Sequence, residues 1–81
     1  MMSRLELEGM LNRLKMQRFE LKTKAAVKIN AIKNILVLSS IRQIDEIDIE
    51  GVHALAVELL GLKRETEKNL EDKKKIEKEL E

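Results

Sequence analysis

The stretch SSIRQIDEIDIEG, residues 39–51, decides the fold because it interrupts a chain that otherwise follows a helical pattern. Its isoleucines do not keep to one helical face, and acidic residues gather before Gly51. An aspartate can accept backbone N–H bonds at the first turn of a helix, and acids suit the positive end of the helix dipole. Of the two candidates, Asp45 and Asp48, the second is the better cap. We therefore expect the chain to reverse direction here, with a turn at about residues 43–48.

The segment before this turn carries a start signal and one long apolar stripe. Ser3 and Glu6 have the S-x-x-E spacing of a capping box, and Met2 and Leu7 are placed for a hydrophobic staple. We expect a first helix from about residue 4 to about residue 42. Its main apolar residues fall in a stripe about 120° wide: Leu7, Met10, Leu11, Leu14, Leu21, Ala25, Ile29, Ile32, Ile35 and Leu36. This stripe is the predicted inner face.

The segment after the turn predicts a second helix over about residues 49–80. Its first half is strongly apolar, but its 3-4 spacing continues through Thr66, Asn69 and Lys73 before it reaches Ile76 and Leu80. We expect this charged end to be solvated and to fray. The predicted intramolecular seam between the helices consists of eight residues: Leu14, Leu21, Ile32, Ile35, Leu36, Leu55, Leu59 and Leu62.

The composition favours helix throughout the 81 residues. Proline is absent and Phe19 is the only aromatic residue, so a core must form from aliphatic ridges between helices. Up to Arg42 nine cationic residues outnumber three anionic ones, whereas twelve anionic residues outnumber seven cationic ones after it. Helices of opposite charge are suited to folding back on each other. The expected fold is all-α: one domain, residues 1–81, made of an antiparallel two-helix hairpin with long, coiled-coil-like helices.

A second apolar surface on the first helix predicts assembly. Val27, Ala31 and Leu38 lie away from the main stripe, and one partner helix cannot cover both surfaces. A single core of this size also supplies only about 3 to 5 kcal/mol. We therefore expect a dimer or tetramer, completing a four-helix bundle through this oligomer interface, or a contact with another helical protein. A domain-swapped pair or one continuous helix through the turn stays open as an alternative.

The residues that carry chemistry in enzymes are sparse in this chain. There is no cysteine, and His53 is the only histidine, so Glu50-x-x-His53 is at most a fragment of a carboxylate metal site. Ser39 or Ser40 would need His53 and an orienting acid in a concave site, and the three glycines are too far apart for a phosphate loop. We expect no catalytic site, no metal and no cofactor, and interpret the chain as a non-enzymatic assembly or adaptor module.

Two other partners fit the sequence less well. The basic residues of the first helix could track a nucleic-acid backbone, which makes a nucleic-acid-binding accessory protein the alternative function: Arg13, Lys15, Arg18, Lys22 and Lys24. Stacking aromatics are missing, and the polar residues near the turn are mostly acidic. Residues 25–41 would suit a membrane surface, but the longest apolar run, residues 35–38, is far too short to span one. The N-terminus has acids where a signal peptide is apolar, so we expect a cytoplasmic location.

Overall fold

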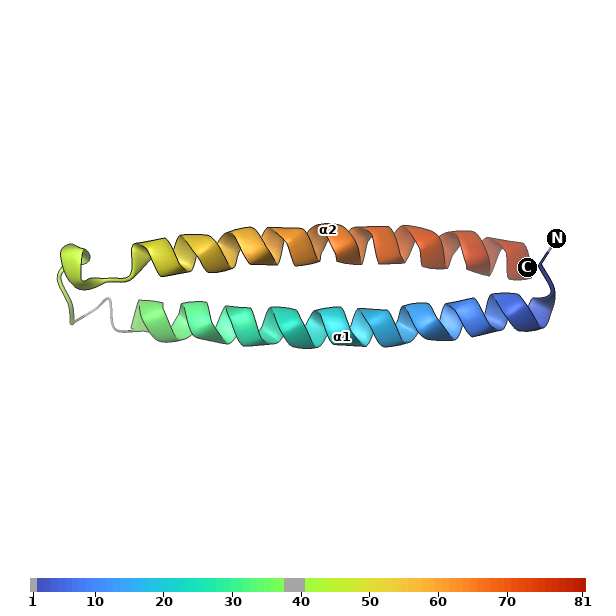
Figure 1. Cartoon of the computed structure of the whole chain (residues 1–81), viewed down its shortest axis with the longest axis horizontal. Helices are drawn as coiled ribbons and strands as arrows, with labels where there is room; N and C mark the ends of the chain where they lie inside the picture. The colour runs from blue at the N-terminus through green and yellow to red at the C-terminus, as the bar shows by residue number, and fades with distance from the viewer. Residues whose placement is uncertain (1, 38–40) are drawn as a thin grey trace.

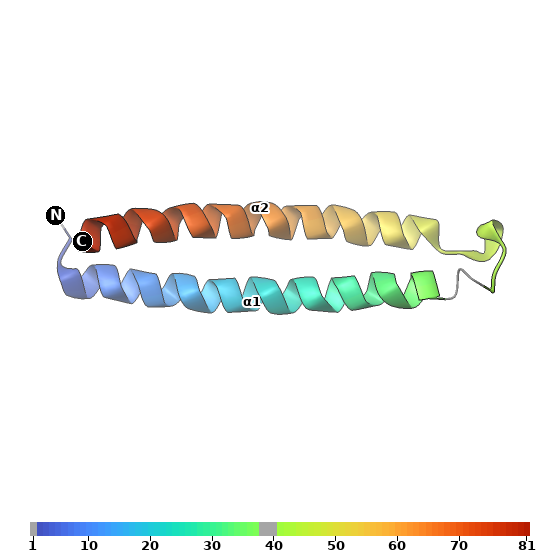
Figure 2. The same ribbon diagram turned by 180° about the vertical axis from the view of Figure 1, so that it is seen from behind.

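The computed structural model describes residues 2–37 and 41–81, and it is a slender antiparallel hairpin (Figure 1). Helix α1 spans Arg4–Val37, a short 3-10 helix η2 spans Ile44–Glu46, and helix α2 spans Ile49–Leu80. The two long helices lie side by side along their whole length in both views (Figures 1 and 2), and the molecule measures 60 × 15 × 15 Å. The structure confirms the all-α, two-helix hairpin.

The start of α1 is fixed by Ser3. Its hydroxyl oxygen accepts a hydrogen bond from the backbone N–H of Glu6 at 3.2 Å, and its carbonyl accepts one from Leu7 at 3.1 Å. The bond from Leu7 is the first of the helix's own i→i−4 bonds, and the bond from Glu6 to the Ser3 side chain satisfies one of the four N–H groups that a helix leaves unpaired at its first turn. One turn further on, Arg4 donates to the Glu8 carboxylate at 3.1 Å, a pair of the i,i+4 type. Local sequence alone therefore accounts for where this helix begins.

The chain leaves the helical conformation earlier than the sequence suggested. We expected the first helix to continue to about residue 42, but within the described residues α1 spans Arg4–Val37, while Ile41 already lies in a turn and Arg42 in a bend. Gln43 is already extended, with φ −72° and ψ 155°. Serine and β-branched isoleucine are weaker helix formers than the Leu, Lys and Ala that precede them, which agrees with an end in this part of the sequence.

Asp48 connects the turn to α2 through both its backbone and its side chain. With φ −76° and ψ 71°, and a hydrogen bond of 2.8 Å from Ile49 N–H to the Ile47 carbonyl, it forms an inverse γ-turn. Its carboxylate then accepts the backbone N–H of Gly51 at 2.9 Å. Its carbonyl accepts Val52 N–H at 3.2 Å. Asp48 is thus the N-cap of α2.

The contact between the helices buries a narrow strip. Of the described residues, only Leu7, Leu21, Asn69 and Ile76 are fully buried. Most of the other apolar residues that face the partner helix are half-buried, because two helices touch along one line and leave both sides of it open. The charged half of α2, which we expected to be loosely packed, thus supplies two of the four buried side chains.

Asn69 is the most buried residue of the described chain, at 2% exposure. Its side-chain amide donates to the Leu14 carbonyl at 2.9 Å and to the Gln17 side-chain oxygen at 2.9 Å. Its own Oδ1 has no hydrogen-bond partner within the described part of the molecule. A polar side chain at a core position specifies register at a cost in stability, so these bonds fix which residues of α1 lie opposite Asn69.

Ion pairs contribute little to the contact between α1 and α2. Within the described ranges, Lys28 and Glu58 form the one ion pair between the helices, at 2.8 Å. The other pairs are i,i+4 neighbours on one helix, such as Lys63 with Glu67 at 3.8 Å. The opposite charges of the two halves therefore lie mostly on the exposed faces. Neither helix, over the residues described, is long and apolar enough to cross a membrane.

Candidate functional site

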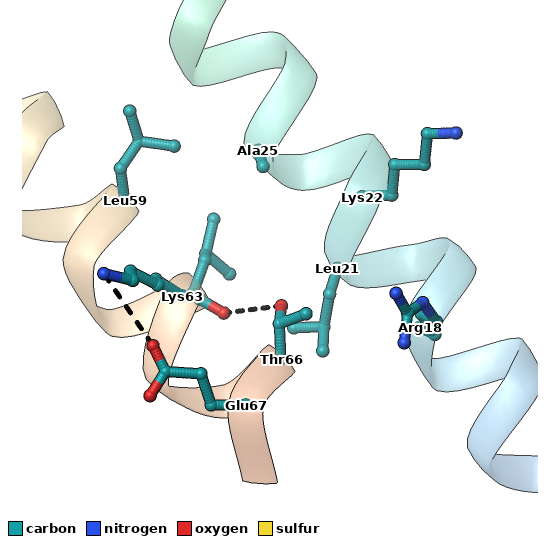
Figure 3. A pocket seen from close by; sticks show the side chains of 9 residues that line it. Arg18, Leu21, Lys22, Ala25, Leu59, Lys63, Thr66 and Glu67 are labelled. Carbon is teal, nitrogen blue, oxygen red and sulfur yellow. Dashed lines mark hydrogen bonds and ion pairs between the residues drawn. The ribbon is translucent and has the colours of Figure 1, made fainter. Parts of the chain in front are cut away.

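A hollow of about 440 Å³ opens between the helices near the middle of the rod (Figure 3). Leu21 and Ala25 of α1 and Leu59 and Leu62 of α2 line its apolar part. The remaining lining residues are polar or charged: Arg18, Lys22, Lys63, Thr66 and Glu67. The Thr66 hydroxyl donates to the Leu62 carbonyl at 2.8 Å, so its one donor is used inside its own helix. The hollow is a polar-rimmed depression with an aliphatic floor.

On α1 the side of the rod that holds this hollow becomes apolar toward the turn. Lys22, Ile29 and Leu36 follow one another at intervals of seven residues, which is close to two helical turns, so they share one face. Ala25 and Ile32 form the adjacent row, nearer to α2. The row that begins with a cation at the hollow therefore continues with two large aliphatic side chains.

The same side of α2 also changes from charged to apolar between the hollow and the turn. Lys63 lines the hollow, and Ala56 and Ile49 precede it at intervals of seven residues. Leu59 and Val52 form the row nearer to α1. We call this apolar surface the Ile29 flank, and it comprises eight residues of the two helices: Ala25, Ile29, Ile32, Leu36, Ile49, Val52, Ala56 and Leu59.

The Ile29 flank is substantially exposed. Ile29 is 41% exposed, Leu36 46% and Ile49 45%, while Ile32 and Val52 beside them are half-buried. The predicted stripe on the first helix was broader than the strip that one antiparallel helix covers, so its outer row remains at the surface. Contiguous apolar surface of this kind marks interaction sites in monomeric structures.

The opposite side of the rod is more acidic. Lys22 and Lys63 line the first hollow, and Arg13 and Asp72 are each nine residues away from one of them on the same helix. Nine residues make two and a half helical turns, so Arg13 and Asp72 lie on the opposite side of their helices. They line a second hollow of about 440 Å³ with Met10. We call this side the Val27 flank, and its residues lie on repeats of seven or on adjacent rows: Met10, Arg13, Val27, Ala31, Glu58, Glu65, Asp72 and Glu79.

The predicted oligomer interface falls on the Val27 flank. Val27 is 65% exposed and Ala31 is half-buried, whereas Leu38 lies outside the described residues. Across from Val27 the flank presents Glu58, which accepts from Lys28. An interface here would rest on few large apolar side chains and would have to accommodate a row of carboxylates. The prediction stands beside the Ile29 flank as an alternative surface.

The eight residues of the predicted intramolecular seam lie at different depths. Leu21 is 5% exposed and Leu36 is 46% exposed, on the Ile29 flank. The other six are half-buried between the helices: Leu14, Ile32, Ile35, Leu55, Leu59 and Leu62. The list of eight omits three buried residues: Leu7, which the sequence placed on the inner face, and Asn69 and Ile76, which it placed on the 3-4 spacing of the second helix.

The five basic residues suggested for nucleic acid are divided between the two sides of α1. Lys15, Arg18 and Lys22 lie on the side of the first hollow, and Arg13 and Lys24 on the side of the Val27 flank. All five are exposed, and none takes part in an ion pair with another described residue. A backbone of phosphates lying along one side would meet only part of this set.

The structure assembles no metal site in its described part, where no three His, Asp or Glu side chains lie close enough together to hold an ion. His53 is exposed on α2, and Ser39 and Ser40 lie outside the described residues. We consider the two flanks and their hollows as the candidate functional surfaces. Comparison with family models, with curated proteins and with solved structures found no match for this chain.

Proposed function

We propose that this chain is a non-enzymatic helical assembly module that self-associates through the Ile29 flank, so that two hairpins complete a four-helix bundle. The single observation that carries this proposal is the apolar surface shared by both helices next to the turn, where Ile29 and Ile49 are each more than two-fifths exposed. Burial of aliphatic surface is worth about 25 cal/mol per Å². Only four of the described residues are fully buried, so covering this surface would add substantially to the apolar area removed from water.

The charges around the first hollow favour one orientation of the two copies. Lys22 and Lys63 line the same hollow and so lie at the same height. With both turns at the same end of a bundle, Lys22 of one copy would face Lys63 of the other. With the turns at opposite ends, the apolar halves next to the turns overlap, and Lys22 of one copy no longer faces Lys63 of the other. We therefore propose an antiparallel dimer of hairpins that overlap through their turn-proximal halves.

A pair of variants on one helix tests this proposal. Ile29→Glu places a carboxylate on the Ile29 flank, and Val27→Glu places the same group two residues away on the opposite side. Light-scattering mass after size exclusion, over a concentration series, should give a dimer for the native chain and for Val27→Glu. It should give a monomer for Ile29→Glu at concentrations where the native chain is a dimer. Circular dichroism should report a helical chain in all three cases.

The alternative outcomes assign the interface elsewhere. A dimer that survives Ile29→Glu but dissociates with Val27→Glu would place the contact on the predicted interface of Val27, Ala31 and Leu38. A native chain that stays monomeric at every concentration would reject self-association. The Ile29 flank would then be a surface for a different protein.

A further inference from the structure

We infer that the hollow lined by Arg18, Lys22 and Lys63 is a docking groove for an acidic amphipathic helix of a partner protein. The inference starts from the contrast between floor and rim. Leu21 is 5% exposed, and Ala25, Leu59 and Leu62 beside it are half-buried, so the floor is aliphatic. This floor offers a ligand apolar contact and no polar side chain other than Thr66, whose hydroxyl is already bonded to Leu62.

The rim carries more positive charge than its own neighbours neutralise. Among the described residues, Arg18 and Lys22 take part in no ion pair, and both are exposed. Glu67 is the one acid of the rim, and it lies 3.8 Å from Lys63. Figure 3 shows Arg18 and Lys22 on α1, and Lys63 and Glu67 on α2 across the hollow. The charge that complements this rim is negative.

The shape of the hollow favours a helix as the occupant. It lies in the groove between two antiparallel helices, and its lining on α1 runs from Arg18 to Ala25, about two turns or 10 Å. A third helix laid in such a groove places side chains at i, i+3, i+4 and i+7 on the floor and flanking side chains over the rim. Such a helix would complement the groove if it carried aliphatic residues at the positions over the floor and Glu or Asp at the positions over the cationic rim.

A second copy of this chain is a poor occupant at this position. Two hollows placed face to face would bring Arg18, Lys22 and Lys63 of both copies together, and like charges across an interface oppose association. The acidic row of the chain, Glu58, Glu65, Asp72 and Glu79, does not supply the helix either. The exposed face beside that row holds Gly61, Lys68 and Lys75 instead of large aliphatic residues. We therefore assign the groove to a helix from another protein.

Binding of a designed peptide to the full chain tests the docking groove. The probe is a fluorescein-labelled 18-residue helix with leucine at the floor positions and glutamate at the flanking positions, and its partner probe carries lysine at those flanking positions. Fluorescence anisotropy at low salt should show the acidic peptide binding about tenfold or more tightly than the basic one, and the difference should shrink at high salt because the rim is solvent-exposed.

Two charge-reversal variants locate the binding. Arg18→Glu with Lys22→Glu should weaken binding of the acidic peptide about tenfold, since two rim attractions become repulsions. The control, Lys24→Glu with Lys33→Glu, changes the net charge by the same amount on exposed positions that line neither large hollow, and should stay within about twofold of the native chain. Circular dichroism checks that both variants remain helical.

Three results would overturn the inference. They are equal binding of the acidic and basic peptides, equal weakening by the two double variants, and no acidic-peptide binding by a chain that does bind anionic phospholipid vesicles. The last would assign the cationic rim to a membrane surface. The hollow and the Ile29 flank share Ala25 and Leu59, but the cationic rim of Arg18, Lys22 and Lys63 belongs to the hollow alone, and the charge-reversal variants act on that rim. A monomeric chain that binds the acidic peptide would therefore reject the dimer and keep the groove, and a dimer that ignores the peptide would do the reverse.

Discussion

The two halves of the hairpin differ in a way that their composition does not suggest. The half next to the turn holds most of the large aliphatic residues, yet apart from Leu21, near the middle of the rod, none of its described residues is fully buried. The half next to the chain ends is dense in charge, yet it contains three of the four buried residues of the described chain: Leu7, Asn69 and Ile76. Two helices bury one strip whatever their composition. The turn-proximal half therefore has more apolar surface than its strip can cover, and that surplus is the surface available to a partner.

The largest expected effect compares a buried residue of one half with an exposed residue of the other. Ile76→Ala should destabilise the chain by about 2 to 5 kcal/mol because it leaves a cavity beside α1, whereas Ile29→Ala should cost less than about 1 kcal/mol in the monomer. Urea unfolding followed by circular dichroism, at a concentration that keeps the chain monomeric, measures both. Equal losses would show that the turn-proximal half is as tightly packed as the other and would remove the contrast.

A substitution at Asn69 tests the charged half further, because the hydrogen bonds of this residue fix the register between the two helices there. Asn69→Leu removes a buried Oδ1 that has no partner in the described structure and fills the space with apolar atoms. We expect the free energy of unfolding to rise by about 1 kcal/mol while the register becomes less well defined. Thermal unfolding measures the first effect, and disulfide cross-linking of cysteine pairs placed in the native and shifted registers measures the second.

The control for this prediction is Asn69→Ala, which removes the same two hydrogen bonds to Leu14 and Gln17 but leaves a cavity. It should destabilise the chain. If Asn69→Leu also lowered the stability, the two hydrogen bonds would be worth more than the burial of leucine. Asn69 would then stabilise the fold as well as its register.

The sequence predicts where the chain reverses better than it predicts which side chains are buried. Ser3 and Asp48 act through their own neighbours, so local spacing was enough to identify the two helix caps. Burial depends on which strip faces the other helix, and the stripe containing Ile29 and Leu36 was too broad to show which row would remain outside. Asn69 was treated as a weakness of the seam because polarity alone does not reveal that α1 offers it a carbonyl and an amide oxygen.

Glycine substitutions compare the N-terminal turn of α2 with its middle. Gly61→Ala should stabilise the chain by about 0.5 to 1 kcal/mol, because alanine has the higher helix propensity. No atom outside its own stretch of helix lies within 4 Å of the added Cβ. Gly51→Ala should gain less or lose stability, since its Cβ would collide with the Asp48 carboxylate that caps the helix. Thermal unfolding of the two variants measures the difference. A Gly51→Ala gain equal to that of Gly61→Ala would mean that the cap contributes nothing.

The smallest expected effect concerns the ion pair that joins the helices on the Val27 flank. Lys28 and Glu58 are 2.8 Å apart, with side chains 28% and 54% exposed, so water screens much of their attraction. A double-mutant cycle with Lys28→Met and Glu58→Gln should give a coupling energy of about 0.2 to 1 kcal/mol, and added salt should reduce it. Lys28→Met alone is expected to be nearly neutral, because the Lys28 side chain is only 28% exposed and methionine keeps most of its aliphatic atoms. A coupling well above this range would mean that charge pairing, and not the aliphatic strip, holds the turn-proximal half together. The apolar surplus of the Ile29 flank would then be independent of hairpin stability, and variants on it would report association alone.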